Sequence, residues 1–231
     1  LCACGSQAKG GGDTPPPAVT VPTDWQMNDD AEVAAHVKAG REQTFTCTDK
    51  NKNTVSCTYS LPALTDKTDG AKAINADISA KYDGLFAKAQ EAAAQNKMPE
   101  PESIRYSAYV NDDIVTLVIT GEGQGHNLSY NVYNYNKATG KQLDNAALLQ
   151  YLQRDYDKTF AALSKALEAD YVAKFKPENF PDDYYYQLDL TVGDEGIKQS
   201  QLFLNSEAEL YAVCTEHAGV GNGTFQVLIR C

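Results

Sequence analysis

The sequence predicts an α+β domain in which two helical blocks pack on an antiparallel β-sheet. Short runs alternate apolar with polar residues, as strands do, and two longer stretches repeat apolar residues at helical spacing. The strands come in runs broken by the helical blocks, which favours antiparallel pairing. With 231 residues, 42% of them hydrophobic, the chain can bury a substantial core. We expect a tether over 1–25 and one folded domain over 26–231.

The predicted tether has the composition of a lipid-anchored leader. Leu1-Cys2-Ala3-Cys4 fits the end of a bacterial lipoprotein signal, which makes Cys4 the candidate lipidation site. Residues 5–21 are rich in Gly, Pro and Thr, which suits a flexible spacer; a leader with two incidental cysteines is the alternative. No run of about 18 apolar residues occurs, so no membrane-spanning helix is predicted. This interpretation places the protein in the cell envelope, anchored by lipid and facing the periplasm or cell surface.

The first half of the domain is predicted to contain a hairpin and a long helix. Residues 44–47 and 54–61 are rich in strand-forming side chains and flank a polar turn centred on Lys52. Thr68 or Asp69 can cap a helix from Ala71 to about Asn96, which ends before two prolines. Its apolar face comprises Ile74, Ile78, Tyr82, Leu85, Phe86 and Ala89.

The middle of the chain, from Asp113 to Lys141, is predicted to form the central hairpin. A half-buried strand over 104–110 turns at 111–112 into an apolar strand over 114–119, and a Gly-rich connection over 121–126 leads to a strand over 128–136. After a turn at 138–141, Asp144 can cap a short Leu-rich helix, and a longer helix follows over 156–175.

The last third reads as strands again. Residues 184–192 alternate in a way that predicts a strand, with a turn at 193–196. Residues 200–204 and 209–214 are expected to pair, and a Gly-rich loop at 218–223 leads to a final strand over 225–231.

Six cysteines occur, and their spacing does not fit a structural zinc site. Four of them fit two disulfides of an oxidising compartment. The hairpin turn would place Cys47 and Cys57 opposite each other, and Cys214 with Cys231 follows by elimination. We predict no metal and no cofactor.

Three pieces of the sequence carry a resemblance to a known family. They are Asp113–Val118; Gly123–His126 with Tyr130–Lys141; and Leu202–Tyr211 with Ala218–Gly221. Together they resemble a domain-of-unknown-function family of bacterial envelope lipoproteins. Similar domains form the outer part of a lysozyme-sensing anti-sigma factor and accompany catalytic domains in some peptidoglycan deacetylases. The likeness covers roughly 45–229 and implies an envelope module. Here Asn134-Tyr135-Asn136 stands where the family tends to have Asn-Phe-Asp, and this sequence has no deacetylase domain.

Charge and tyrosines give the candidate binding surface. A net charge of −11 argues against nucleic acid and anionic membrane surfaces as partners. The acidic surface serves solubility or attracts a basic partner. Two predicted strands carry rings on both faces, so one tyrosine face of each is either covered by a helix or exposed for binding: Tyr130, Tyr133, Tyr135, Tyr184, Tyr185 and Tyr186.

The histidines are the candidate chemical groups. His126 either shapes the Gly-rich bend or forms an acid/base pair with Glu122, and His217, beside Glu216, has the same two interpretations. His36 has no candidate partner in the sequence. A nucleophile elbow, a P-loop and a metalloprotease motif are all absent from the sequence.

Three functions remain open. The first is a non-enzymatic, lipid-anchored envelope module that binds a lysozyme-like basic protein or peptidoglycan. The second is an envelope hydrolase that uses His126 or His217 with a nearby carboxylate. The third is a structural envelope lipoprotein that acts through a sheet edge.

Overall fold

The fold is described from a computed structural model, which covers residues 30–179, 183–218 and 223–231. The predicted tether, Cys4, and part of the loop at 218–223 lie outside these residues. The helices are α1 Asp30–His36, α2 Asp69–Ala94, α3 Asn145–Tyr151, α4 Tyr156–Lys174, α5 Tyr184–Val192 and α6 Asp194–Lys198, with short 3-10 turns η1 Gln124–His126 and η2 Pro177–Asn179. The strands are β1 Val37–Thr48, β2 Thr54–Leu64, β3 Ser103–Asn111, β4 Ile114–Glu122, β5 Leu128–Asn136, β6 Lys141–Leu143, β7 Gln201–Leu204, β8 Leu210–His217 and β9 Thr224–Arg230.

The structure is α+β, as the sequence predicts, but its strands form two sheets. The larger sheet has the order β1-β2-β3-β4-β5-β6, and the smaller has the order β7-β8-β9. Neighbouring strands are antiparallel except β2 and β3, which run parallel and meet in one register pair, Tyr59 with Ile104. The described residues contain no helix long and apolar enough to cross a membrane.

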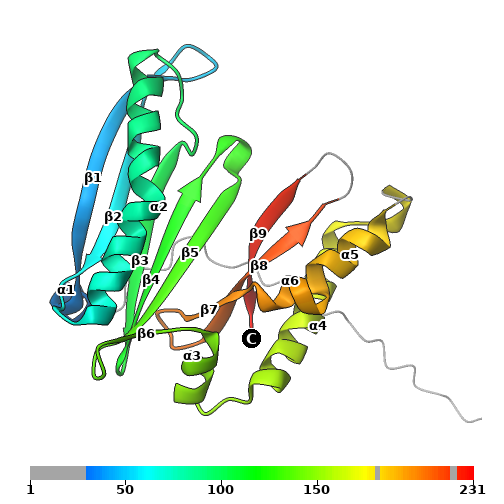
Figure 1. The fold of residues 1–231 in the computed structure, drawn as a ribbon. Helices are drawn as coiled ribbons and strands as arrows, with labels where there is room; N and C mark the ends of the chain where they lie inside the picture. The colour runs from blue at the N-terminus through cyan, green and yellow to red at the C-terminus, as the bar shows by residue number, and fades with distance from the viewer. Residues whose placement is uncertain (1–29, 180–182, 219–222) are drawn as a thin grey trace, which may run out of the picture.

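Helix α2 covers one face of the larger sheet (Figure 1). Thr68 is its N-cap, as predicted, and the Thr68 hydroxyl accepts a bond from the Ala71 amide. The apolar stripe read from the sequence faces the sheet, because Ile74, Ile78 and Phe86 are buried. On the sheet, Val115, Leu117 and Ile119 of β4 join the same core.

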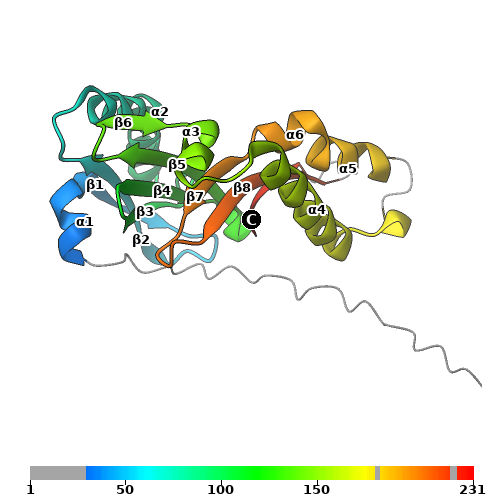
Figure 2. The same ribbon diagram turned by 90° about the horizontal axis from the view of Figure 1, so that it is seen from below.

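The second sheet and the later helices form two further layers. Figure 2 shows β7 and β8 between the larger sheet and helices α4 to α6. In β8, alternate residues face opposite ways: Leu210, Ala212 and Cys214 pack with the helices, whereas Tyr211 and Val213 pack toward the larger sheet. The helical core is completed by Leu148, Phe160, Leu163, Leu167 and Ile197. Each sheet therefore has one helix-covered face.

Side-chain amides connect the two sheets. Asn134 of β5 is buried, and its Nδ2 atom donates to the Leu202 carbonyl at 2.7 Å. The backbone N–H of Val132 donates to Gln201 Oε1 at 2.9 Å, and the N–H of Tyr130 donates to Gln226 Oε1. Strand β6 pairs only with the last three residues of β5, so these glutamines satisfy edge amides that β6 does not reach.

One predicted element is wrong. Residues 184–192 form helix α5 rather than a strand, and most of the predicted turn at 193–196 begins helix α6. The helix buries positions 184 and 191 and half-buries 187 and 188, which together follow the i, i+3, i+4, i+7 pattern of an amphipathic helix. Packing of these positions against α4 and β8 outweighs the strand propensity of the tyrosines.

Candidate functional site

An open groove of about 950 Å³ lies at one end of the larger sheet. Its walls come from the β1–β2 turn, the chain just after α2, the start of β3 and the β4–β5 connection. Cys57, Met98, Glu102, Glu122 and His126 are among the lining residues. The groove therefore contains one of the two predicted histidines together with the carboxylate expected beside it.

Glu122 and His126 are in contact, as one of the two interpretations of the sequence predicts. His126 Nδ1 lies 2.7 Å from Glu122 Oε1, and the imidazole side chain is 90% exposed. Gly125 and His126 both have positive φ, 74° and 62°, so the connection bends sharply at these two residues. The contact spans the bend, and the imidazole remains open to solvent.

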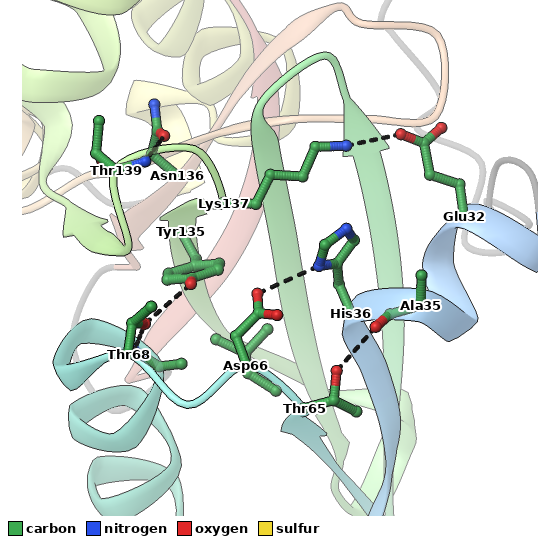
Figure 3. Close-up of polar contacts among 12 residues, drawn as sticks. Glu32, Ala35, His36, Thr65, Asp66, Thr68, Tyr135, Asn136, Lys137 and Thr139 are labelled. Carbon is green, nitrogen blue, oxygen red and sulfur yellow. Dashed lines mark hydrogen bonds and ion pairs between the residues drawn. The ribbon is translucent and has the colours of Figure 1, made fainter.

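His217 does not line the groove with His126. Its backbone fixes the end of β8 against two helices, because Tyr171 Oη donates to its carbonyl and its N–H donates to Thr191 Oγ1, both at 2.9 Å. Among the described residues no group of three or more His, Cys, Asp or Glu is placed to hold a metal. His36, for which the sequence offered no partner, lies 3.2 Å from Asp66 (Figure 3).

The tyrosines of β5 are covered, so they do not form the exposed binding face considered above. Tyr133 and Tyr135 point toward α2 and are 3% and 1% exposed. Tyr133 Oη donates to Asp77 Oδ2 at 2.7 Å, and burial beside that carboxylate raises the pKa of Tyr133. Tyr135 Oη lies 2.9 Å from Thr68 Oγ1 at the start of α2 (Figure 3). Tyr130 is half-buried between the sheets.

The tyrosines of α5 divide differently. Tyr184 is 4% exposed, and its ring centroid lies 5.7 Å from that of Tyr171 on α4. Tyr185 and Tyr186 are 74% and 63% exposed. The described exposed large hydrophobic residues all lie on the helical layer, since the others are Tyr151 on α3 and Tyr156 and Val172 on α4.

Acidic side chains accompany the two exposed rings. Asp189 follows Tyr185 by four positions and Tyr186 by three, so all three share one helical face. Asp194 and Glu195 are exposed at the start of α6, directly after α5. We call these five residues the tyrosine–acid surface.

A buried charged cluster lies between β8 and α4, and the sequence analysis did not predict it. Glu216 is 1% exposed, and its Oε2 atom lies 3.0 Å from Lys174 Nζ, which also contacts Asp170. Its Oε1 atom has no hydrogen-bond partner among the described residues. Burial raises the pKa of Glu216 to about 7, and Lys174 opposes that rise. In the sequence, the burial of Glu216 was indicated by its position, because it continues the alternating apolar face of Leu210, Ala212 and Cys214.

The four cysteines of the domain are free thiols in the structure. The sequence analysis expected Cys47 and Cys57 directly opposite each other. In the hairpin register Cys47 pairs with Val55 and Cys57 with Phe45, so the two cysteines are diagonal neighbours. Cys214 and Cys231 lie in or against the helical core, and burial raises the pKa of each thiol to about 12. The two disulfides stay predictions from the sequence.

Comparison with known proteins adds no family to these observations. No protein-family model matches the chain, and no curated protein matches it. The envelope-family resemblance, with the lysozyme or peptidoglycan partner it implies, therefore stays a prediction from the sequence.

Proposed function

We propose that the protein is a non-enzymatic binding module of the cell envelope, anchored by a lipid on Cys4, whose tyrosine–acid surface binds a basic, lysozyme-like protein. The observation that carries the proposal is the exposure of Tyr185 and Tyr186, 74% and 63%, beside exposed carboxylates. Tyrosine is enriched at binding hot spots because its ring buries a large area and its hydroxyl can still bond. Tyr185 contacts the ring of Tyr184 edge-on at 5.3 Å, and both exposed rings still present most of their surface to solvent.

Charge selects the class of partner. The chain carries a net charge of −11. Asp189 shares the helical face of the two rings, and Asp194 and Glu195 are exposed at the start of the next helix. An acidic patch of this kind steers a basic protein toward the surface and disfavours an acidic one. A wall-acting enzyme with a strongly basic surface is complementary to it, and a neutral glycan would gain nothing from the carboxylates.

Calorimetric titration of the full chain with lysozyme tests the proposal. Soluble peptidoglycan fragments and cytochrome c, a basic protein unrelated to the wall, serve as parallel ligands. We expect binding to lysozyme that weakens as salt rises, and a loss of about 30-fold or more in Tyr185→Ser/Tyr186→Ser. Tyr151→Ser/Tyr156→Ser, which removes exposed rings from α3 and α4, should leave the affinity unchanged.

Three results would contradict the proposal. One is the absence of heat with lysozyme, and another is equal affinity in both double variants. The third is binding to peptidoglycan fragments alone, which would replace the basic protein by the wall polymer. Equal affinity for cytochrome c would reduce the interaction to unspecific charge attraction.

The hydrolase alternative rests on the 2.7 Å contact between Glu122 and His126 in the groove. A carboxylate that orients an imidazole is a usual acid/base arrangement, although this imidazole lies in solvent. Release of soluble fragments from peptidoglycan by the wild-type chain, abolished in both Glu122→Gln and His126→Ala, would establish this function. Equal release by the two variants would exclude these residues as the catalytic pair.

A further inference from the structure

A second cleft, of about 530 Å³, lies along the first residues of β5, where the larger sheet has an open edge. Strand β6 pairs only with Asn134–Asn136, so the start of β5 has no neighbour among the described strands on the side away from β4. Helix α2 forms one wall of the cleft, and β8 and β9 of the smaller sheet form another; these elements are labelled in Figure 1. The volume lies within the range of about 300–1,000 Å³ that small-molecule sites occupy.

The cleft is nearly uncharged, although the chain is strongly acidic. Glu100 is the one formally charged side chain among the described residues that line it, and its Oε2 atom accepts from the Gln124 N–H at 3.3 Å. Arg105 acts on the Tyr130 hydroxyl through its charge but does not line the cleft. An anion would be repelled by Glu100, and a cation would find only this exposed carboxylate, which is already bonded. Because a charged ligand would lose water here without a good partner, the lining selects a neutral one.

Apolar surfaces and neutral polar groups are interleaved along the walls. The rings of Tyr82 and Tyr130 and the side chain of Leu85 are half-buried and contribute apolar surface. Hydroxyl and amide side chains complete the lining: Asn127, Ser129, Thr215, Thr224 and Gln226. A tyrosine ring has an apolar body and a polar tip. A sugar ring has the matching arrangement, with C–H groups on its faces and hydroxyl groups around its rim.

An extended peptide is the other ligand that an open strand edge could take. It would need the outward N–H groups of β5, but the N–H of Tyr130 donates to Gln226 Oε1 and that of Val132 donates to Gln201 Oε1. Gln226 can still serve a ligand rich in hydroxyl groups, because a carboxamide whose oxygen accepts a bond carries two N–H donors on its nitrogen. The cleft is therefore better suited to a saccharide than to a peptide strand.

Two glycines leave space in the cleft. A Cβ atom on Gly121 would lie 2.7 Å from Ser129 Oγ and 3.7 Å from Pro101 Cβ, so it would enter the space between these two lining residues. Gly123 also lines the cleft, and a Cβ atom there would overlap the Glu100 carboxyl group. Because both side chains are missing, a ligand can approach the backbone closely.

We propose that this cleft binds a neutral oligosaccharide. The ring faces of the sugar pack against Tyr82 and Tyr130, and its hydroxyl groups bond the side chains of Asn127, Thr224 and Gln226. The site is separate from the tyrosine–acid surface on α5 and α6, and it does not depend on the proposed binding of a basic protein. It also differs from the groove of about 950 Å³, whose lining includes several lysine and carboxylate side chains.

NMR titration of the isotope-labelled full chain tests the proposal, because it detects weak binding and locates it by residue. The probes are chitotriose and cellotriose, which are neutral, and trigalacturonate, which has a similar size but carries a carboxylate on each sugar. We expect saturable shifts of the Gly121, Gly123 and Ser129 amide signals with at least one neutral trisaccharide, and none with trigalacturonate. The location of the shifts needs no variant, so a substitution that unfolds the chain does not decide the outcome.

Matched variants test the contacts. Asn127→Ala/Thr224→Ala should weaken binding of the same trisaccharide about tenfold, because it removes two exposed hydrogen-bonding side chains from the cleft. Thr48→Ala/Asn51→Ala removes the same residue types from the larger groove and should leave the affinity unchanged. Tyr185→Ser/Tyr186→Ser, which alters the tyrosine–acid surface, should also leave it unchanged.

The proposal is overturned if neither neutral trisaccharide causes saturable shifts, if trigalacturonate binds as tightly as the neutral sugars, or if the shifts lie in the larger groove or on the tyrosine–acid surface. Equal affinity in Asn127→Ala/Thr224→Ala and Thr48→Ala/Asn51→Ala would overturn it as well, and so would a loss of saccharide binding confined to Tyr185→Ser/Tyr186→Ser. Because no lysozyme is present, a failure of this titration is distinguishable from a failure of the lysozyme titration.

Discussion

Lys174 Nζ lies 3.0 Å from Glu216 Oε2, and the carboxyl group it contacts is 1% exposed. The pair closes the helix-facing side of β8, where the preceding positions are apolar. A buried carboxyl with a single cationic neighbour makes the stability of this layer depend on pH.

Glu216→Gln should flatten the pH dependence of stability. Burial raises the pKa of Glu216 from 4.5 to about 7, so the folded chain holds this proton more tightly than the unfolded chain. The stabilisation is complete below pH 4.5 and is lost as pH rises toward 7, by roughly 3 kcal/mol. Urea unfolding at pH 5, 6, 7 and 8 measures it. Glu195→Gln, at an exposed site, should keep the wild-type slope, and a slope unchanged in Glu216→Gln would refute the assignment.

Lys174→Met should destabilise the protein more at pH 8 than at pH 5. At pH 8 Glu216 is ionised, and removal of its cation leaves a buried unpaired charge, a loss on the order of 3–5 kcal/mol. At pH 5 Glu216 is neutral and only the contact with Asp170 is lost, so the cost should be smaller than at pH 8. Guanidinium unfolding at both pH values provides the comparison, with Lys165→Met at an exposed position of α4 as control. Equal losses at the two pH values would contradict the prediction.

Asn134→Ala should weaken the contact between the sheets. The Asn134 amide donates to the Leu202 carbonyl at 2.7 Å, and its oxygen accepts from Thr116 Oγ1 at 3.0 Å. The truncation leaves both partners buried and unsatisfied, at a cost of about 2–3 kcal/mol. Asn127→Ala, at an exposed position, should change the unfolding midpoint little. A loss of stability in Asn134→Ala as small as that in Asn127→Ala would contradict the prediction.

Two glycine substitutions should change stability in opposite directions. Gly140 has a φ of 71°, and an added Cβ would lie 2.7 Å from Thr68 Cγ2, so Gly140→Ala should cost more than about 1 kcal/mol. Gly84 lies inside α2 with nothing within 4 Å of its added Cβ, and Gly84→Ala should stabilise the protein by about 0.5–1 kcal/mol. Thermal unfolding of both variants measures the contrast. The same sign in both would be inconsistent with the structure.

Substitution of Tyr184 should reduce the stability of the fold, whereas substitution of Tyr185 or Tyr186 should not. Tyr184→Ala should cost about 3 kcal/mol, because the ring is 4% exposed against Tyr171. Tyr185→Ser and Tyr186→Ser should stay within about 0.5 kcal/mol of the wild type. Chemical denaturation of each single variant tests this. A large loss at Tyr185 or Tyr186 would mean that these rings pack in the core.

The sequence predicted the elements whose periodicity is clear, and it failed where two periods fit one segment. Helix α2 and the central hairpin β4–β5 occur where predicted, because their apolar residues repeat at one spacing only. At 184–192 the residues fit a strand by alternation and a helix through positions 184, 188 and 191. Contacts with α4 and β8, remote in sequence, decide between them.

Candidate site residues were predictable where partners lie close in the chain. Glu122 and His126 are four apart and were recognised as a pair. Glu216 and Lys174 lie 42 residues apart, and their meeting depends on how α4 packs on β8. The contact between Cys57 and Met98 was missed for the same reason, since Met98 reaches the hairpin only through the length and direction of α2.

The amides of Tyr130 and Val132 already donate to Gln226 and Gln201. A strand from another molecule that approached this part of β5 would find no unused donor at these two positions. Such open edges are where β-proteins join into unwanted polymers. Here two neutral side chains close this part of the edge without adding charge or proline to the sheet.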